Sequence, residues 1–177
     1  MREAAQGHSR PLVLVGSSST GKTRACWESV QPLAKNGWCL WHPFAPTRAQ
    51  AALDGIEKVE PRTVVWLNEA QHYLDLDAPG TCEALAAALH TLLTDSERGP
   101  VLILGTLWPE SAESYALPPT PGGPDPYSRV RELLAGRLVG VPESFDGAAL
   151  RSASVLAAGR PTAGRCPHQN EWRRVRA

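Results

Sequence analysis

Short apolar runs alternate along the chain with stretches in which apolar residues recur at helical spacing. Four runs are apolar almost throughout and end at Gly, Pro or polar residues, which is typical of buried strands; they cover residues 11–15, 38–41, Thr63–Leu67 and 101–104. A further run at residues 138–141 predicts a fifth strand. Apolar strands separated by helices predict an α/β fold, a three-layer αβα sandwich whose helices cover both faces of a mostly parallel five-stranded sheet.

The helical pattern is clearest over Thr81–Thr94, where apolar residues recur at every third or fourth position. Another helix is predicted from about Lys22, with Pro32 ending or kinking it early, and a weaker one over residues 47–53. Residues 117–126 hold five prolines and two glycines and therefore predict a loop.

The end of this loop carries the signals of a helix start, because Asp125 is a typical N-cap and Pro126 a typical first helical residue.

The whole pattern of apolar and polar residues divides the chain into three parts. Residues 1–10 form an N-terminal extension and residues 11–158 form one core. Residues 159–177 hold five arginines, one acidic residue and almost no aliphatic residues, which predicts a basic, disordered tail.

The composition excludes several classes of protein. Lys and Arg total 18 and Asp and Glu also total 18, so the formal charge of zero argues against a chain that coats nucleic acid or anionic membranes. No apolar run approaches the ~20 residues of a membrane span. The cysteines follow neither a disulfide nor a zinc pattern; they are Cys26, Cys39, Cys82 and Cys166. We expect a cytoplasmic protein with no membrane contact and no direct sign of nucleic-acid binding.

One segment matches the phosphate-binding pattern G-x-x-x-x-G-K-[ST]. It consists of Gly16, Ser17, Ser18, Ser19, Thr20, Gly21, Lys22 and Thr23. A predicted strand enters this segment and a predicted helix leaves it, as such a loop requires. Only three of the 18 basic residues are lysines, so a lysine in the required place is not expected by chance. The alternative is a Ser/Gly-rich turn that binds nothing.

Each part of this loop has a physical task. The glycines allow a tight turn in which consecutive backbone N–H groups point at one phosphate cluster, and the helix beginning near Lys22 adds its positive end. Lys22 places a charge on the β- and γ-phosphates, and the hydroxyl of Thr23 is suited to Mg²⁺.

A second pair of polar residues, Asn68 and Glu69, directly follows the strand Thr63–Leu67. In a parallel sheet, ligands bind at this carboxyl end. Glu69 is a candidate catalytic base, while Asn68 stands where an Asp usually helps to hold Mg²⁺. An amide can bind a metal-bound water but adds no charge, so metal binding should be weak and hydrolysis slow or absent. The alternative is that both residues only cap the following helix.

Thr106 follows the strand at 101–104 and is a candidate sensor of the γ-phosphate, although a polar residue before the helix start at Trp108 is equally ordinary. An arginine after the proline-rich loop could act as an arginine finger. The favoured interpretation gives the following residues surface or packing roles: His42, His72, Trp66, Trp108, Arg129, Arg131 and Arg137.

The order of these three elements, Gly16 to Thr23, then 64–69, then 101–106, resembles the additional-strand, catalytic-glutamate class of P-loop NTPases. Within that class, residues 10–150 resemble the ATP-binding domain of bacterial STAND-type signalling ATPases. The resemblance implies that the strand carrying Thr106 lies between the strands carrying the phosphate loop and Glu69. It also implies ATP bound with Mg²⁺, Glu69 as catalytic base and Thr106 as sensor.

The chain departs from this family in two ways. Asn68 replaces an acid, and the family's helical lid has no counterpart in residues 159–177, so we expect a truncated relative or a module that works with another chain or by self-association. The leading hypothesis is an ATP-binding switch with weak or conditional ATPase activity. The alternatives are a small-molecule kinase and a non-hydrolysing ATP-binding interaction module.

Overall fold

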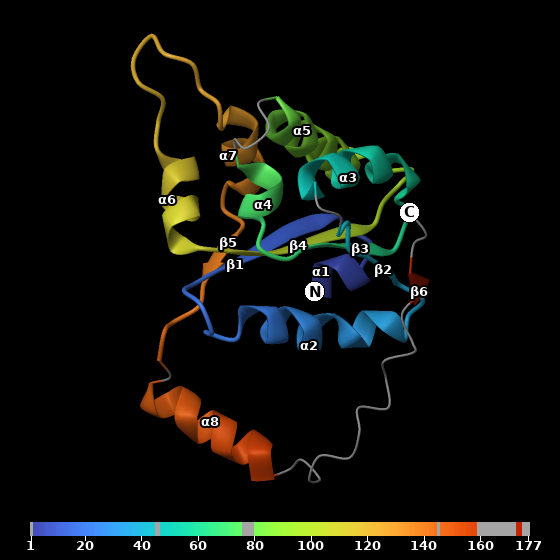
Figure 1. Cartoon of the computed structure of the whole chain (residues 1–177). Coiled ribbons are helices and arrows are strands. Elements are labelled where there is room, and N and C mark those ends of the chain that lie inside the picture. The colour runs from blue at the N-terminus through green and yellow to red at the C-terminus, as the bar shows by residue number, and fades with distance from the viewer. Residues whose placement is uncertain (1, 45–46, 76–79, 145, 159–172, 175–177) are drawn as a thin grey trace.

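The computed structural model describes residues 2–44, 47–75, 80–144, 146–158 and 173–174. Its centre is a sheet in which all neighbouring strands are parallel, in the order β5-β1-β4-β3-β2-β6 (Figure 1). The strands are β1 (Arg10–Val15), β2 (Cys39–Trp41), β3 (Thr63–Leu67), β4 (Val101–Leu107), β5 (Leu138–Gly140) and β6 (Arg173–Arg174). The predicted α/β fold with a parallel sheet is confirmed.

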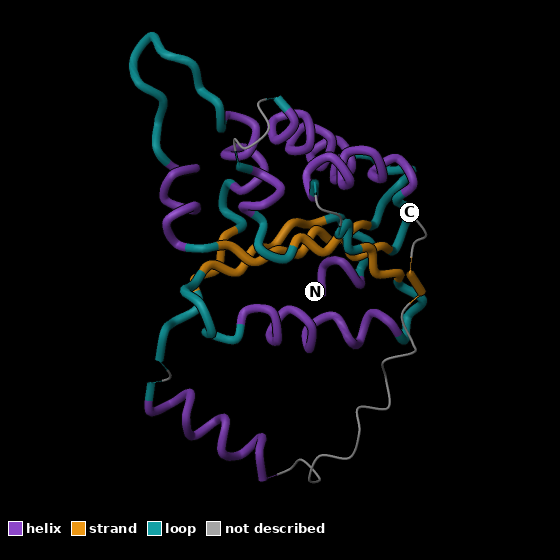
Figure 2. The backbone as a smooth tube through the Cα atoms, viewed as in Figure 1, coloured by secondary structure: helices purple, strands orange, loops and turns teal. Residues whose placement is uncertain are grey.

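Helices lie on both sides of this sheet, which gives three layers (Figure 2). One face carries α3 to α7, the other carries α1 and α2, and α8 lies farther out beyond α2 (Figure 1). The helices are α1 (Arg2–Ala5), α2 (Lys22–Ala34), α3 (Arg48–Gly55), α4 (Gln71–Leu74), α5 (Thr81–Thr94), α6 (Pro109–Ala116), α7 (Ser128–Leu134) and α8 (Gly147–Ala158), with a 3-10 turn at Ile56–Lys58. None of the helices in the described ranges is long and apolar enough to cross a membrane.

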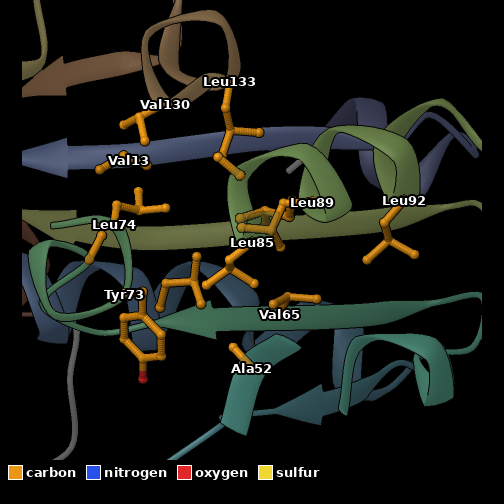
Figure 3. Packing of buried hydrophobic residues seen from close by; sticks show 14 of the residues in the cluster. Val13, Ala52, Val65, Tyr73, Leu74, Leu85, Leu89, Leu92, Val130 and Leu133 are labelled. Atoms are coloured by element: carbon orange, nitrogen blue, oxygen red, sulfur yellow. The ribbon is translucent and has the colours of Figure 1, made fainter. Parts of the chain in front are cut away.

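The sheet is buried on both faces because its strands carry apolar residues at consecutive positions. In β3 every residue is buried; Val65 and Leu67 pack in the larger cluster with α5 and α7, and Val64 packs in the cluster with α2. Figure 3 shows the larger cluster, where Leu85 and Leu89 of α5 lie over the strands. This core holds the carboxyl ends of β1, β3 and β4 at one edge.

The predicted helix start after the proline-rich loop is wrong by two residues. The helix α7 begins at Ser128, with Tyr127 and not Asp125 at the N-cap. The carboxylate of Asp125 accepts the backbone N–H of Tyr127 at 3.3 Å and, more closely, hydrogen bonds from the guanidinium of Arg131, the nearest at 2.7 Å. This ion pair joins the carboxylate to Arg131, a residue six positions further on and inside α7. The inward positions Val130, Leu133 and Leu134 are buried as the helical spacing requires.

Three other elements differ from the sequence expectation. The strand β4 continues through Leu107, so Thr106 lies inside the strand. The helix α2 includes Pro32 and runs on to Ala34. Pro32 lacks the backbone N–H that would donate to the carbonyl four residues earlier, and at the last turn this loss does not end the helix. Most of residues 159–177 lie outside the described residues; the two that are described form β6, parallel to β2, where the sequence predicted a disordered tail and a five-stranded sheet.

Burial of the thiols leads to a first prediction. The three described cysteines are free, and Cys26 and Cys82 are buried while Cys39 is half-buried. Burial raises the pKa of Cys26 to about 11, so only about one Cys26 thiol in a thousand is ionised at pH 8. Burial also raises the pKa of Cys82. We expect Cys39 to react with a disulfide reagent at pH 8 while Cys26 and Cys82 remain unmodified, as measured by peptide mass spectrometry. Guanidinium should make all three reactive, and labelling of native Cys26 at the rate of Cys39 would contradict the fold.

Candidate functional site

The candidate site lies at the carboxyl edge of three adjacent strands. The strand β4 lies between β1 and β3, so the expected insertion of the Thr106 strand between the other two is confirmed. In register, Val15 pairs with Leu107 and Leu67 pairs with Gly105. The polar residues that follow these strands therefore meet at one edge, where parallel α/β sheets bind ligands.

The loop from β1 to α2 needs glycine at two positions for different reasons. A side chain at Gly16 would place its Cβ 3.1 Å from the backbone oxygen of Val141 and 3.1 Å from the hydroxyl of Thr20. Gly21 has a φ of 84°, in the left-handed region that favours glycine. The hydroxyl of Thr20 closes the loop by donating to the carbonyl oxygen of Ser17 at 3.0 Å. The loop is therefore compact and turns directly into α2.

Lys22 is the buried cation of the site, with 5% of its surface exposed. Its ammonium donates to the carbonyl oxygens of Gly16 at 2.6 Å and Ser17 at 2.7 Å. An ammonium has three N–H donors, and with these two acceptors among the described residues one donor is left for an anion in front of the loop. The first turn of α2 holds no acidic residue, and its positive end therefore adds to the charge of Lys22.

Asn68 faces the phosphate loop and does not cap a helix. Its side-chain oxygen accepts a hydrogen bond from the hydroxyl of Thr23 at 3.0 Å and lies 3.4 Å from the hydroxyl of Thr106. The N-cap of α4 is Ala70, without a side-chain hydrogen bond. The alternative that Asn68 and Glu69 serve as helix caps is thus wrong. Asn68 instead connects the strands β3 and β4 to the start of α2.

Glu69 has an unusual backbone conformation, with a φ of 57°, which is uncommon for a residue other than glycine and strained by about 1–3 kcal/mol. Thr106 stabilises this turn, because its buried hydroxyl accepts the backbone N–H of Glu69 at 2.8 Å. The same hydroxyl lies 3.3 Å from Oε1 of Glu69. The structure therefore places the predicted sensor Thr106 against the predicted base Glu69.

The carboxylate of Glu69 has two further donors that the sequence analysis did not assign. Oε2 accepts the side-chain N–H of Gln71 at 2.8 Å and the indole N–H of Trp108. Burial raises the pKa of Glu69, but hydrogen bonds from Gln71 and Trp108 and the positive charge of Lys22 outweigh it, so the pKa lies below its ordinary value. Glu69 is therefore ionised at neutral pH.

A cavity of about 400 Å³ lies between the phosphate loop and Glu69. It is lined by Ser18, Ser19, Thr20, Gly21, Lys22, Thr23, Arg24, Glu69 and Trp108. Trp108 was expected to pack in the core, yet 41% of its surface is exposed. In the sequence, Trp108 could be found only as the residue that follows the predicted strand at 101–104 and its Thr106, and Gln71 only as the residue two positions after Glu69. Neither position predicts a hydrogen bond to the carboxylate of Glu69.

The other candidate residues lie elsewhere. His72 is exposed, and the ring of His42 lies 5.5 Å from that of Phe44. Arg131 pairs with Asp125 and Arg129 with Glu132, while Arg137 donates to the carbonyl oxygen of Ala135. None of these five lines the cavity beside Lys22. The surface interpretation of these residues holds in the structure.

Thr23 and Asn68 are the oxygen donors that fit a divalent cation here. Mg²⁺ takes oxygen ligands and is usually held by few protein groups together with substrate phosphates. The hydroxyl of Thr23 and the amide oxygen of Asn68 lie 3.0 Å apart, close enough to serve one ion or its water shell. Within the described ranges no cluster of three His, Cys, Asp or Glu residues could hold a metal.

No family model matches the chain, and a search of curated proteins finds no similar sequence.

Proposed function

We propose that the protein is a P-loop NTPase domain of the additional-strand, catalytic-glutamate class, similar to the ATP-binding domains of bacterial STAND-type signalling ATPases. It binds ATP with Mg²⁺ in the cytoplasm and acts as a nucleotide switch with weak or conditional ATPase activity. The observation that supports this best is the meeting of Lys22, Thr23 and Glu69 around one cavity at the carboxyl edge of a parallel sheet. Its nucleotide-dependent change of state would be transmitted to another protein chain or to a second copy of this chain.

Phosphate binding follows from the loop and α2. Backbone N–H groups of the loop and the positive end of α2 attract the phosphates, and Lys22 supplies a charge that is already desolvated. Thr23 and Asn68 would hold Mg²⁺ or its water, and that ion would neutralise charge on the phosphates. Thr23 would then turn its hydroxyl hydrogen away from Asn68.

Hydrolysis would depend on Glu69. An ionised carboxylate can orient water and accept its proton, and Glu69 is held at the cavity by Gln71, Trp108 and Thr106. Two features make this activity weak. The lowered pKa of Glu69 reduces its strength as a base, and Asn68 adds no negative charge to retain the cation.

The second candidate is a non-hydrolysing ATP-binding module, and the neutral amide of Asn68 favours it. A small-molecule kinase has less support. The loop after α6 holds no arginine between Leu117 and Pro126, and Arg131 is already paired with Asp125. Transfer of phosphate to a small-molecule acceptor in place of water would favour the kinase hypothesis over the ATPase.

The test is an assay of Mg²⁺-dependent ATP binding and phosphate release in which wild type is compared with Asn68→Asp. A carboxylate at this position attracts the cation, and we expect turnover to rise about tenfold at limiting Mg²⁺, equivalent to ~1.4 kcal/mol. Asn36→Asp is the matched control, because Asn36 lies exposed after α2 and its side chain donates to the carbonyl oxygen of Pro32, away from the cavity. Failure of wild type to bind Mg-ATP would refute the proposed function. Binding without phosphate release in both wild type and Asn68→Asp would favour the non-hydrolysing module.

A further inference from the structure

The indole of Trp108 contacts the carboxylate that the proposed ATPase would use as its base. Its backbone is constrained on both sides, by buried Leu107 at the end of β4 and by Pro109 at the first position of α6. A residue before proline is restricted to extended conformations, and Trp108 has φ −84° and ψ 150°. The backbone conformation of Trp108 is therefore restricted, and the position of the indole depends mainly on its side-chain torsion angles.

The two oxygens of Glu69 are held unequally. Oε2 accepts from both Gln71 and Trp108. Among the described residues, the contact of Oε1 is the hydroxyl of Thr106 at 3.3 Å, and this hydroxyl also accepts the backbone N–H of Glu69 at 2.8 Å. Two nitrogen donors thus anchor Oε2, while Oε1 has one long contact in the described part of the chain.

Trp108 also borders the cavity itself, together with Lys22 and the phosphate loop. Its ring is half-exposed, so its burial is not needed to complete the core. A side chain that contacts the carboxylate and borders the cavity is suited to hold the carboxylate toward a ligand there.

We propose that Trp108 is a positioning residue whose indole N–H holds Oε2 of Glu69, so that Oε1 is the oxygen available to a water molecule in the cavity. This inference rests on the proposed ATPase function. It assigns Trp108 no contact with the reacting atoms, because its effect passes through Glu69.

The first test is a proton–nitrogen NMR spectrum of the indole N–H groups, in which the signal of Trp108 is the one lost in Trp108→Phe. We expect Glu69→Gln to move this signal, because the charged acceptor of the indole N–H becomes neutral. Glu110→Gln should leave it in place, since Glu110 is an exposed acid close in sequence on α6. An unmoved signal in Glu69→Gln would overturn the proposal whether or not the protein hydrolyses ATP.

The second test is kinetic. Trp108→Phe keeps an aromatic ring but removes the N–H, and we expect kcat to fall about ten- to a hundredfold while KM for Mg-ATP changes less than about twofold. Thermal melting of the variant should match wild type because the ring is half-exposed. An unchanged kcat would overturn the proposal. A wild type that hydrolyses no ATP would refute the proposed ATPase, and the indole signal alone would then decide whether Trp108 holds Glu69.

Discussion

Replacing Lys22 with alanine is expected to weaken ATP binding at least about a hundredfold. Hydrogen bonds that involve a charged group contribute ~1.5–3 kcal/mol each, and every ~1.4 kcal/mol corresponds to a factor of ten in affinity. Lys22 is the buried cation of the loop, and its ammonium lies at the carbonyl oxygens of Gly16 and Ser17. Titration calorimetry of wild type and Lys22→Ala with Mg-ATP measures the difference.

Two further variants separate the effect of the lost charge on ATP affinity from an effect of the substitution on folding. Lys22→Ala leaves the carbonyl oxygens of Gly16 and Ser17 without their donor, so Lys22→Gln, which keeps N–H donors but loses the charge, is measured beside it. Lys35→Ala is the matched control, because Lys35 is exposed at the other end of α2. We expect Lys22→Gln to bind nearly as weakly as Lys22→Ala and Lys35→Ala to bind as wild type does. Wild-type affinity in a folded Lys22→Ala would refute nucleotide binding at this loop.

Glu69→Gln is expected to lower the rate of ATP hydrolysis by about a hundredfold or more, the usual contribution of general acid–base catalysis. An amide oxygen can still accept the N–H groups of Gln71 and Trp108 that Oε2 accepts in wild type. The geometry is therefore kept while the base is lost. Affinity for Mg-ATP should stay within a few-fold of wild type, because the contacts expected to bind phosphate come from the loop and α2.

Single-turnover phosphate release measures this effect without interference from product release. Glu113→Gln on α6 is the matched control, since Glu113 is an exposed acid of the same type. Equal phosphate release by purified Glu69→Gln and wild type would mean that another group activates the water, and Glu69 would then lose its assigned role.

The strands and main helices could be predicted because their signals are local. In β3 and α5 the apolar spacing predicts both ends of the element, Thr63 to Leu67 and Thr81 to Thr94, without reference to any partner. The start of α7 could not be predicted in this way. Asp125 has the chemistry of an N-cap, but its carboxylate is more strongly engaged by Arg131 once the loop has folded back. A local cap signal contains no information on such a competitor.

The pairing of β6 with β2 is likewise non-local, because Arg173 pairs with Cys39 from the other end of the chain. Parallel strands pair across long connections, and a strand of two basic residues carries no apolar pattern. The same limit applies to the candidate site. Glu69, which accepts the hydrogen bonds from Gln71 and Trp108, has a positive φ, and the sequence does not predict that conformation for a glutamate.

The sequence by itself determined which chemical groups stand at the carboxyl edge of the sheet. The glycines, Lys22 and Thr23 follow one strand and Asn68 and Glu69 another, and parallel strands bring their carboxyl ends to the same edge. Only the tertiary structure decided which of these groups meet. Side-chain contacts depend on the order of the strands and on the backbone conformation of the loops that follow them. Both are set by the packing of the whole core. That packing joins Thr23 to Asn68 and Trp108 to Glu69, and it leaves His72 and Arg129 away from the cavity.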